Sequence, residues 1–138
     1  MVGPAVPPAD VGISQVRGIR GATTATSNTK EAILEATTEL LQELAAANDI
    51  DPDYIAGIWL TTTPDLNAEF PAVAARIGMG WTHAALMSGH EMAVPDAQER
   101  CIRALILLNT EKKPEEINFV YLRGAVNLRG RQGRGETS

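Results

Sequence analysis

A strand-like pattern begins at residue 16 of the chain, and a helical period follows it. Residues 16–24 read Val-Arg-Gly-Ile-Arg-Gly-Ala-Thr-Thr, an extended pattern that predicts a strand. Over residues 29–47 apolar side chains return to one face, which predicts a helix, and Asn28 and Glu31 have the spacing of a capping box at its start. The apolar positions of that helix are Ile33, Leu40, Leu41 and Leu44.

The next apolar runs are shorter and are separated by proline, glycine and aspartate. Residues 55–63 have strand character because they combine Ile, Trp and Leu with three threonines. Residues 70–77 fit a short helix with Pro71 in its first turn. Residues 82–87 fit a short strand, and a loop over residues 88–92 leaves it.

The last third of the chain predicts one more helix and two strands. Asp96 can cap a helix that runs to about residue 109, because apolar residues line one of its sides. Residues 117–122 and 125–128 then fit two short strands. The order β-α-β-α-β-α-β-β predicts an α/β fold, and the closely spaced last strands need antiparallel partners, so we expect a mixed sheet.

The 138 residues are enough for one domain with a substantial core. We expect that domain over residues 13–129, between a flexible extension at 1–12 and a flexible tail at 130–138. Residues 1–10 lack the positive charge of a signal peptide, and no segment approaches the roughly 20 apolar residues that span a bilayer. We therefore expect a cytoplasmic protein with no membrane partner.

The formal net charge of -5 argues against binding to nucleic acid, which rests on clustered Lys and Arg. Arginine nevertheless makes up nine of the 12 basic residues, and its planar fork matches a carboxylate. The expected ligand is therefore a small anion bound at a local site.

Metal and cofactor sites are not expected. Cys101 is the single cysteine, which excludes an internal disulfide and a multi-cysteine metal site, and its apolar surroundings favour a place in the core. His83 and His90 are too isolated for a metal site. Gly78-Met79-Gly80 does not complete a dinucleotide fingerprint.

Arg20 is the first candidate for a ligand-binding residue. In an extended segment it shares its face with Gly18 and Ala22, so its guanidinium stands over a patch with room for a ligand. The alternative is an edge strand whose arginines discourage aggregation. Arg76 and Arg129 fall at element ends, where a site could gather them.

Three other residues are candidates for the binding site, and each also has a simple structural explanation. Arg103 lies where exposed sequence gives way to apolar sequence, a suitable place to bind a partly desolvated anion, but Glu99 could pair with it on a helix surface. Glu91 could be a solvated loop residue, and Tyr121 could serve only in packing.

Short motifs follow one another along the chain. They are Arg-Gly-Ile-Arg-Gly-Ala-Thr-Thr at 17–24, Thr-Pro-Asp-Leu at 63–66, Phe70-Pro71-Ala72 with Arg76, Glu91-Met92, Cys101-Ile102-Arg103, Val120-Tyr121-Leu122 and Leu128-Arg129. Over about residues 14–129 this series resembles the monofunctional chorismate mutases of the trimeric, pseudo-α/β-barrel type. The series is much more specific than any one of its motifs.

The resemblance implies a homotrimer whose active sites lie between neighbouring subunits. It also implies the Claisen rearrangement of chorismate to prephenate, a step toward phenylalanine and tyrosine, without cofactor or metal. By motif match, Arg20 and Tyr121 would hold the carboxylate of the enolpyruvyl side chain. Arg103 would bond the ether oxygen, and Glu91 the ring hydroxyl.

The same resemblance implies further contacts with the substrate. Leu128 and Arg129 would close the mouth of the site. The residues that would reach in from the neighbouring subunit are Phe70, Ala72 and Arg76.

Three more positions join the substrate-binding set, namely Val73, Met87 and Ser88. Val73 stands where the family pattern has a lysine, so we expect weaker substrate capture. Ser88 stands where the pattern has a cysteine, and its hydroxyl can still donate and accept a hydrogen bond.

Two other functions stay open. Enzymes that hydrolyse reactive imines and enamines use a similar trimeric scaffold with intersubunit arginines, but Glu91 with Arg103, and the segment 63–72, argue against that chemistry. The other alternative is a non-catalytic protein that binds an anionic metabolite.

Overall fold

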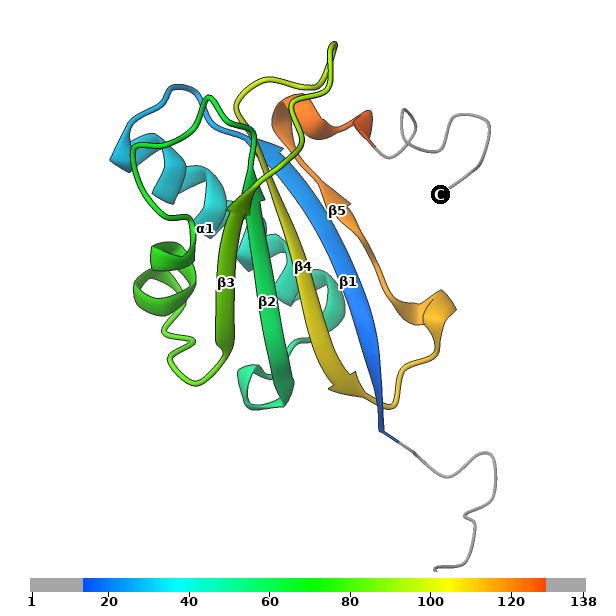
Figure 1. The fold of residues 1–138 in the computed structure, drawn as a ribbon. Coiled ribbons are helices and arrows are strands. Elements are labelled where there is room, and N and C mark those ends of the chain that lie inside the picture. The colour runs from blue at the N-terminus through cyan, green and yellow to red at the C-terminus, as the bar shows by residue number, and fades with distance from the viewer. Residues whose placement is uncertain (1–13, 129–138) are drawn as a thin grey trace, which may run out of the picture.

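A computed structural model describes residues 14–128, which form one five-stranded sheet with helices on one face (Figure 1). The strands lie in the order β3-β2-β4-β1-β5, and their bounds are β1 Gln15–Thr24, β2 Ile55–Thr62, β3 Ala85–His90, β4 Cys101–Thr110 and β5 Val120–Tyr121. The central strand β4 runs antiparallel to both β1 and β2, whereas the β1–β5 and β2–β3 pairs are parallel. The predicted α/β class with a mixed sheet is confirmed.

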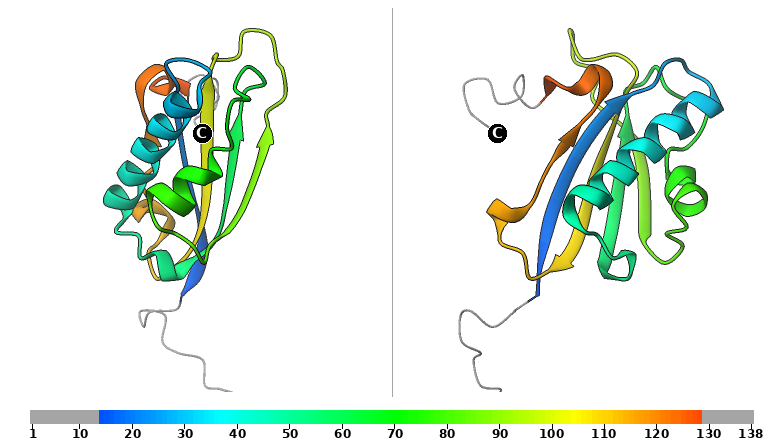
Figure 2. Two further views of the ribbon diagram at one scale, coloured as in Figure 1. Left: turned by 90° about the vertical axis from the view of Figure 1, so that its left-hand side faces the viewer. Right: turned by 180° about the vertical axis from the view of Figure 1, so that it is seen from behind.

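Helix α1, Lys30–Asn48, packs across one face of the sheet, and the short helical turn Ala74–Gly78 lies beside it on the same face (Figure 2). Leu40, Leu41 and Leu44 of α1 are fully buried against strand residues such as Ile19 and Ile106. No helix in residues 14–128 covers the opposite face (Figure 2). That open face is available for a binding site.

The structure confirms the helix predicted at residues 29–47 but corrects its start. Thr29 is the N-cap, and its hydroxyl accepts a hydrogen bond from the Ala32 N–H at 3.1 Å. The predicted capping box of Asn28 and Glu31 is wrong. The Asn28 side-chain oxygen instead accepts from the N–H groups of Asn67 and Ala68, which ties a distant loop to the start of the helix.

The helix predicted from Asp96 to about residue 109 is wrong, because this segment forms the central strand β4. Its side chains alternate with a period of two: Ile102, Ala104 and Ile106 are buried toward α1, and Arg103 and Leu105 face the open side. A continuous apolar run fits either a buried helix or a buried strand. Pairing with β1 and β2 on both sides decides for the strand.

The structure also shifts three shorter elements. The strand predicted at 82–87 is β3, Ala85–His90, so three of the five residues of the predicted loop at 88–92 are strand. The strand predicted at 117–122 is reduced to β5, and residues 125–128 form no strand, because a helical turn, Arg123–Ala125, follows β5. The strand at 55–63 and the short helix at 70–77 are confirmed, apart from one or a few terminal residues.

No helix in residues 14–128 is long and apolar enough to cross a membrane. The same residues contain no group of His, Cys, Asp and Glu side chains arranged to hold a metal ion. The predicted extension at 1–12 and tail at 130–138 lie outside the described residues.

Thr23 gives a test of the core. Its side chain is fully buried, and within residues 14–128 its hydroxyl has no hydrogen-bond partner. Thr23→Val keeps the shape and removes the unpaired hydroxyl, so we expect the free energy of unfolding to rise by about 1 kcal/mol. Urea unfolding of both proteins at one concentration measures this change, and a loss of stability would contradict the unpaired state of the hydroxyl.

Candidate active site

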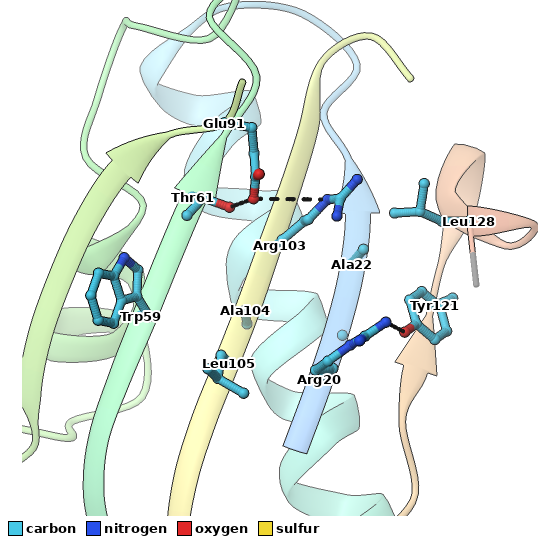
Figure 3. Close-up of a pocket in the computed structure, with 11 residues that line it drawn as sticks. Arg20, Ala22, Trp59, Thr61, Glu91, Arg103, Ala104, Leu105, Tyr121 and Leu128 are labelled. Carbon is cyan, nitrogen blue, oxygen red and sulfur yellow. Dashed lines mark hydrogen bonds and ion pairs between the residues drawn. The ribbon is translucent and has the colours of Figure 1, made fainter. Parts of the chain in front are cut away.

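A pocket opens on the uncovered face of the sheet, near the end where β1 and β2 finish and β4 begins (Figure 3). Its volume is about 270 Å³, which suits a small molecule. All five strands or their flanking residues, and the segment after the turn Arg123–Ala125, supply its lining, which consists of Arg20, Gly21, Ala22, Trp59, Thr61, Glu91, Arg103, Ala104, Leu105, Tyr121 and Leu128. Two cations and one carboxylate thus stand in a mainly apolar pocket.

Arg20 points onto the open face from β1, a strand that lies between β4 and β5. The alternative that Arg20 marks a sheet edge is therefore wrong. Its Nη2 donates to the Tyr121 hydroxyl at 3.2 Å, and its guanidinium lies 5.5 Å from the centre of the Phe119 ring. Both contacts fix the direction of the guanidinium.

The room predicted around Arg20 is only partly free. Ala22 lines the pocket as expected. Gly18 does not, because the Leu105 side chain lies 3.4 Å from the place of a Cβ at that position. The open space therefore lies toward Arg103, on the Ala22 side of Arg20.

Arg103 projects from β4, directly opposite Ala22 of β1 and Thr61 of β2. Its side chain is one-third exposed (34%), and its Nε lies 3.9 Å from Glu91 Oε2. This Nε is buried and makes no hydrogen bond within the described part of the chain. A buried donor without a partner is costly, so an acceptor on a bound ligand would be stabilised here.

The predicted alternative, a helix-surface pair between Glu99 and Arg103, is wrong. Residue 103 lies on a strand, and Glu99 instead pairs with Arg100 at 3.8 Å. Arg103 has Glu91 as its ion-pair neighbour.

Glu91 follows directly after β3 and is held by β2. Its N–H donates to the Thr62 carbonyl at 2.8 Å, and Thr61 Oγ1 donates to its Oε2 at 2.5 Å (Figure 3). Glu91 is therefore an ordered, partly buried acceptor rather than a freely solvated loop residue.

The Thr63-Pro64-Asp65 segment of the motif at 63–66 joins the end of β2 to the start of β4. Thr63 Oγ1 accepts from the Cys101 N–H at 2.9 Å and donates to the Asp65 carboxylate. The other Asp65 oxygen accepts from the Arg100 N–H at 2.9 Å. These bonds fix the backbone two residues before Arg103.

Cys101 is buried, as the sequence predicts for a core residue. Burial raises the pKa of its thiol, and the nearby Arg103 charge opposes this shift without reversing it. The thiol therefore stays protonated at neutral pH and is a poor nucleophile.

The single chain does not bring all the predicted site residues together. Leu128 joins the pocket, and Arg129 lies outside the described residues. Phe70 and Ser88 line a separate cavity of about 340 Å³ beside β3, and Met87 is exposed on the open face. The remaining predicted contacts stand in or beside the short helical turn: Ala72 is buried in the core, Val73 is half-buried and Arg76 is exposed.

Sequence reasoning missed five residues that line the pocket: Gly21, Trp59, Thr61, Ala104 and Leu105. Thr61 and Trp59 alternate along β2, so a period-two reading of this strand places both on one face. Nothing in the sequence alone says that this face is the one that meets Arg20 and Arg103.

The family model for chorismate mutase type I matches residues 16–131. The chain belongs to the chorismate mutase type I family. It is therefore an isomerase, as the resemblance in the sequence predicts, and the alternative of an imine or enamine hydrolase is not favoured.

Curated relatives and a solved structure agree with this family. "Chorismate mutase AroH" of Thermus thermophilus is 45% identical over 115 residues, which cover 83% of this chain and 93% of the relative. "Chorismate mutase AroH" of Bacillus subtilis is 39% identical over 114 residues, which cover 83% of this chain and 90% of the relative. The chorismate mutase structure from Clostridium thermocellum superimposes with a TM-score of 0.77 at 48% identity, over 79% of this chain and 96% of that one.

Asp65 predicts how the stability of this chain depends on pH. Desolvation acts to raise the pKa of its carboxyl, but the hydrogen bonds from Thr63 and the Arg100 backbone, together with the Arg100 charge, lower the pKa below its ordinary value of 3.8. A carboxyl with a lowered folded-state pKa stabilises the fold above the unfolded-state value, and this contribution is lost as the pH falls through the folded-state value.

We therefore expect Asp65→Asn to destabilise the fold at about pH 7 and to do so less at about pH 3. Urea unfolding midpoints of wild type and variant at the two pH values measure this difference. An equal difference between the midpoints at both pH values would show that the charge of Asp65 contributes nothing to stability.

Proposed function

We propose that the pocket between Arg20 and Arg103 binds chorismate and rearranges it to prephenate. The observation that carries the proposal is the buried Arg103 Nε, which lacks a hydrogen-bond partner in residues 14–128 and faces a pocket that also holds Arg20 and Glu91. Chorismate carries two carboxylates, an ether oxygen and a ring hydroxyl. These groups match two cations and one carboxylate acceptor.

The rearrangement is unimolecular and needs no acid, base or nucleophile. The enzyme has to select the compact diaxial conformer and stabilise a polarised transition state. Arg20 and Tyr121 would hold the side-chain carboxylate, and Glu91 would accept from the ring hydroxyl. The proposed reaction needs no cofactor or metal.

Arg103 has the central part in the proposed chemistry. As the carbon–oxygen bond lengthens, negative charge grows on the ether oxygen. A fixed guanidinium beside that oxygen interacts with it more strongly in the transition state than in the bound substrate, which is what raises kcat. The pairing of β4 with both neighbouring strands supplies the required rigidity.

We also propose that the active assembly is a homotrimer in the cytoplasm, with each site shared between two subunits. The open sheet face exposes apolar side chains, among them Trp59 (51%) and Met87 (58%), which a partner subunit would cover. Phe70, Ala72 and Arg76 would then reach the pocket of a neighbour.

Replacement of Arg103 tests the proposed chemistry. We expect Arg103→Ala to lower kcat by about a hundredfold to a thousandfold, because it removes one donor that strengthens in the transition state. Arg103→Lys should also lose most of kcat, since lysine does not reproduce the position of Nε. Citrulline at this position would separate charge from hydrogen bonding, and we expect it to be nearly as defective as alanine.

The measurement is the loss of chorismate absorbance with purified protein. Arg17→Ala is a matched control, because Arg17 lies at the other end of β1 and bonds the Lys112 carbonyl. Near-normal turnover of Arg103→Ala would remove Arg103 from its proposed role, and a wild type that leaves chorismate unchanged would end the proposed function.

A mixing experiment tests the shared site. Arg103→Ala and Arg76→Ala damage opposite halves of the proposed site, so each should be nearly inactive alone. Refolding the two together in equal amounts should restore about one quarter of the wild-type activity, because one site in four then receives two intact halves. Mixtures no more active than their components, or a monomer in sedimentation equilibrium, would contradict the shared trimeric site.

A further inference from the structure

Thr61 holds the pocket carboxylate in place. It projects from β2 onto the open face, where it stands opposite Arg103 of β4 and Gly89 of β3. Its Oγ1 lies 2.5 Å from Glu91 Oε2 (Figure 3). An ionised carboxylate only accepts hydrogen bonds, so the threonine hydroxyl is the donor.

The bond from Thr61 decides which way the carboxylate faces. Arg103 Nε lies 3.9 Å from the same oxygen, Oε2, which is beyond hydrogen-bond distance. Among the described residues, the Thr61 hydroxyl is the one group that donates to the Glu91 carboxylate, and nothing donates to Oε1. One oxygen is thus fixed toward β2, and the other is left for a ligand.

Without this bond the two charged side chains have a competing arrangement. Carboxylate and guanidinium form bidentate ion pairs when nothing holds them apart. The Glu91 backbone is anchored to the Thr62 carbonyl, so the carboxylate is near enough for a side-chain rotation to bring it onto Arg103. A closed pair would occupy both the donor and the acceptor that the substrate needs.

We infer that Thr61 is a positioning residue that keeps Glu91 and Arg103 apart and ready for substrate. This inference rests on the proposed function of the pocket. Thr61 acts through Glu91, so its loss should weaken substrate binding more than it slows the bound substrate. An ion pair that must open before the substrate binds raises KM and leaves kcat nearly unchanged.

Thr61→Val tests the inference because valine keeps the branched shape and the strand propensity and removes only the hydroxyl. We expect kcat/KM for chorismate to fall about 10- to 100-fold, as for the loss of a hydrogen bond to a charged group, with most of the change in KM. Thr61→Ser retains the donor and should restore kcat/KM to within a few-fold of wild type. Thr23→Val is the matched control, since Thr23 lies on the buried face of β1, outside the pocket, and should leave both constants unchanged.

A double-mutant cycle separates positioning from a general effect on folding. If Thr61 acts through Glu91, Thr61→Val should cause little further loss in a Glu91→Ala background. Additive losses of kcat/KM in the double variant would overturn the inference. A Thr61→Val variant with a lower kcat at unchanged KM would also overturn it, because that result indicates a smaller fraction of active protein.

The failures of the two proposals are distinguishable. Wild-type protein that does not accelerate the loss of chorismate overturns the proposed function, and the inference about Thr61 with it. Active wild type with an equally active Thr61→Val, or a Thr61→Ser that stays as defective as Thr61→Val, overturns the role of Thr61 alone.

Discussion

The pairing of β4 with strands on both sides is the constraint on which the rest of the structure depends. β1 and β2 bond to opposite edges of β4 over most of its length. A shift of one residue would turn Ile102 and Ile106 out of the core and Arg103 into it. Burial of apolar side chains on the α1 face therefore decides where the cation points on the other face.

The pocket shows how a chain with a net charge of -5 makes a cationic site. Arg20 and Arg103 face one carboxylate, Glu91, in a partly buried place where charges interact more strongly than in water. Neutral hydroxyls hold two of these groups: Tyr121 accepts from Arg20, and Thr61 donates to Glu91. Because hydroxyls orient charges without cancelling them, these two bonds neutralise neither the guanidinium of Arg20 nor the carboxylate of Glu91.

The Thr63-Pro64-Asp65 segment has a different part from the pocket residues. It does not line the pocket, but it ties the end of β2 to the start of β4 through Asp65 and Thr63. This link lies at the end of the sheet where the pocket opens. The segment can thus serve the site by fixing the backbone that carries Arg103.

The sequence by itself determined the class of the fold, helix α1, β1 and β2, and the face on which Arg20 stands, because these follow from local periodicity. It did not determine β4, since an apolar run of this length satisfies either a helix or a strand until neighbours pair with it. The contacts among Thr61, Glu91 and Arg103 were likewise decided by tertiary structure alone. These residues lie 12 to 42 positions apart, and strand register, a property of paired backbones rather than of any local segment, brings them together.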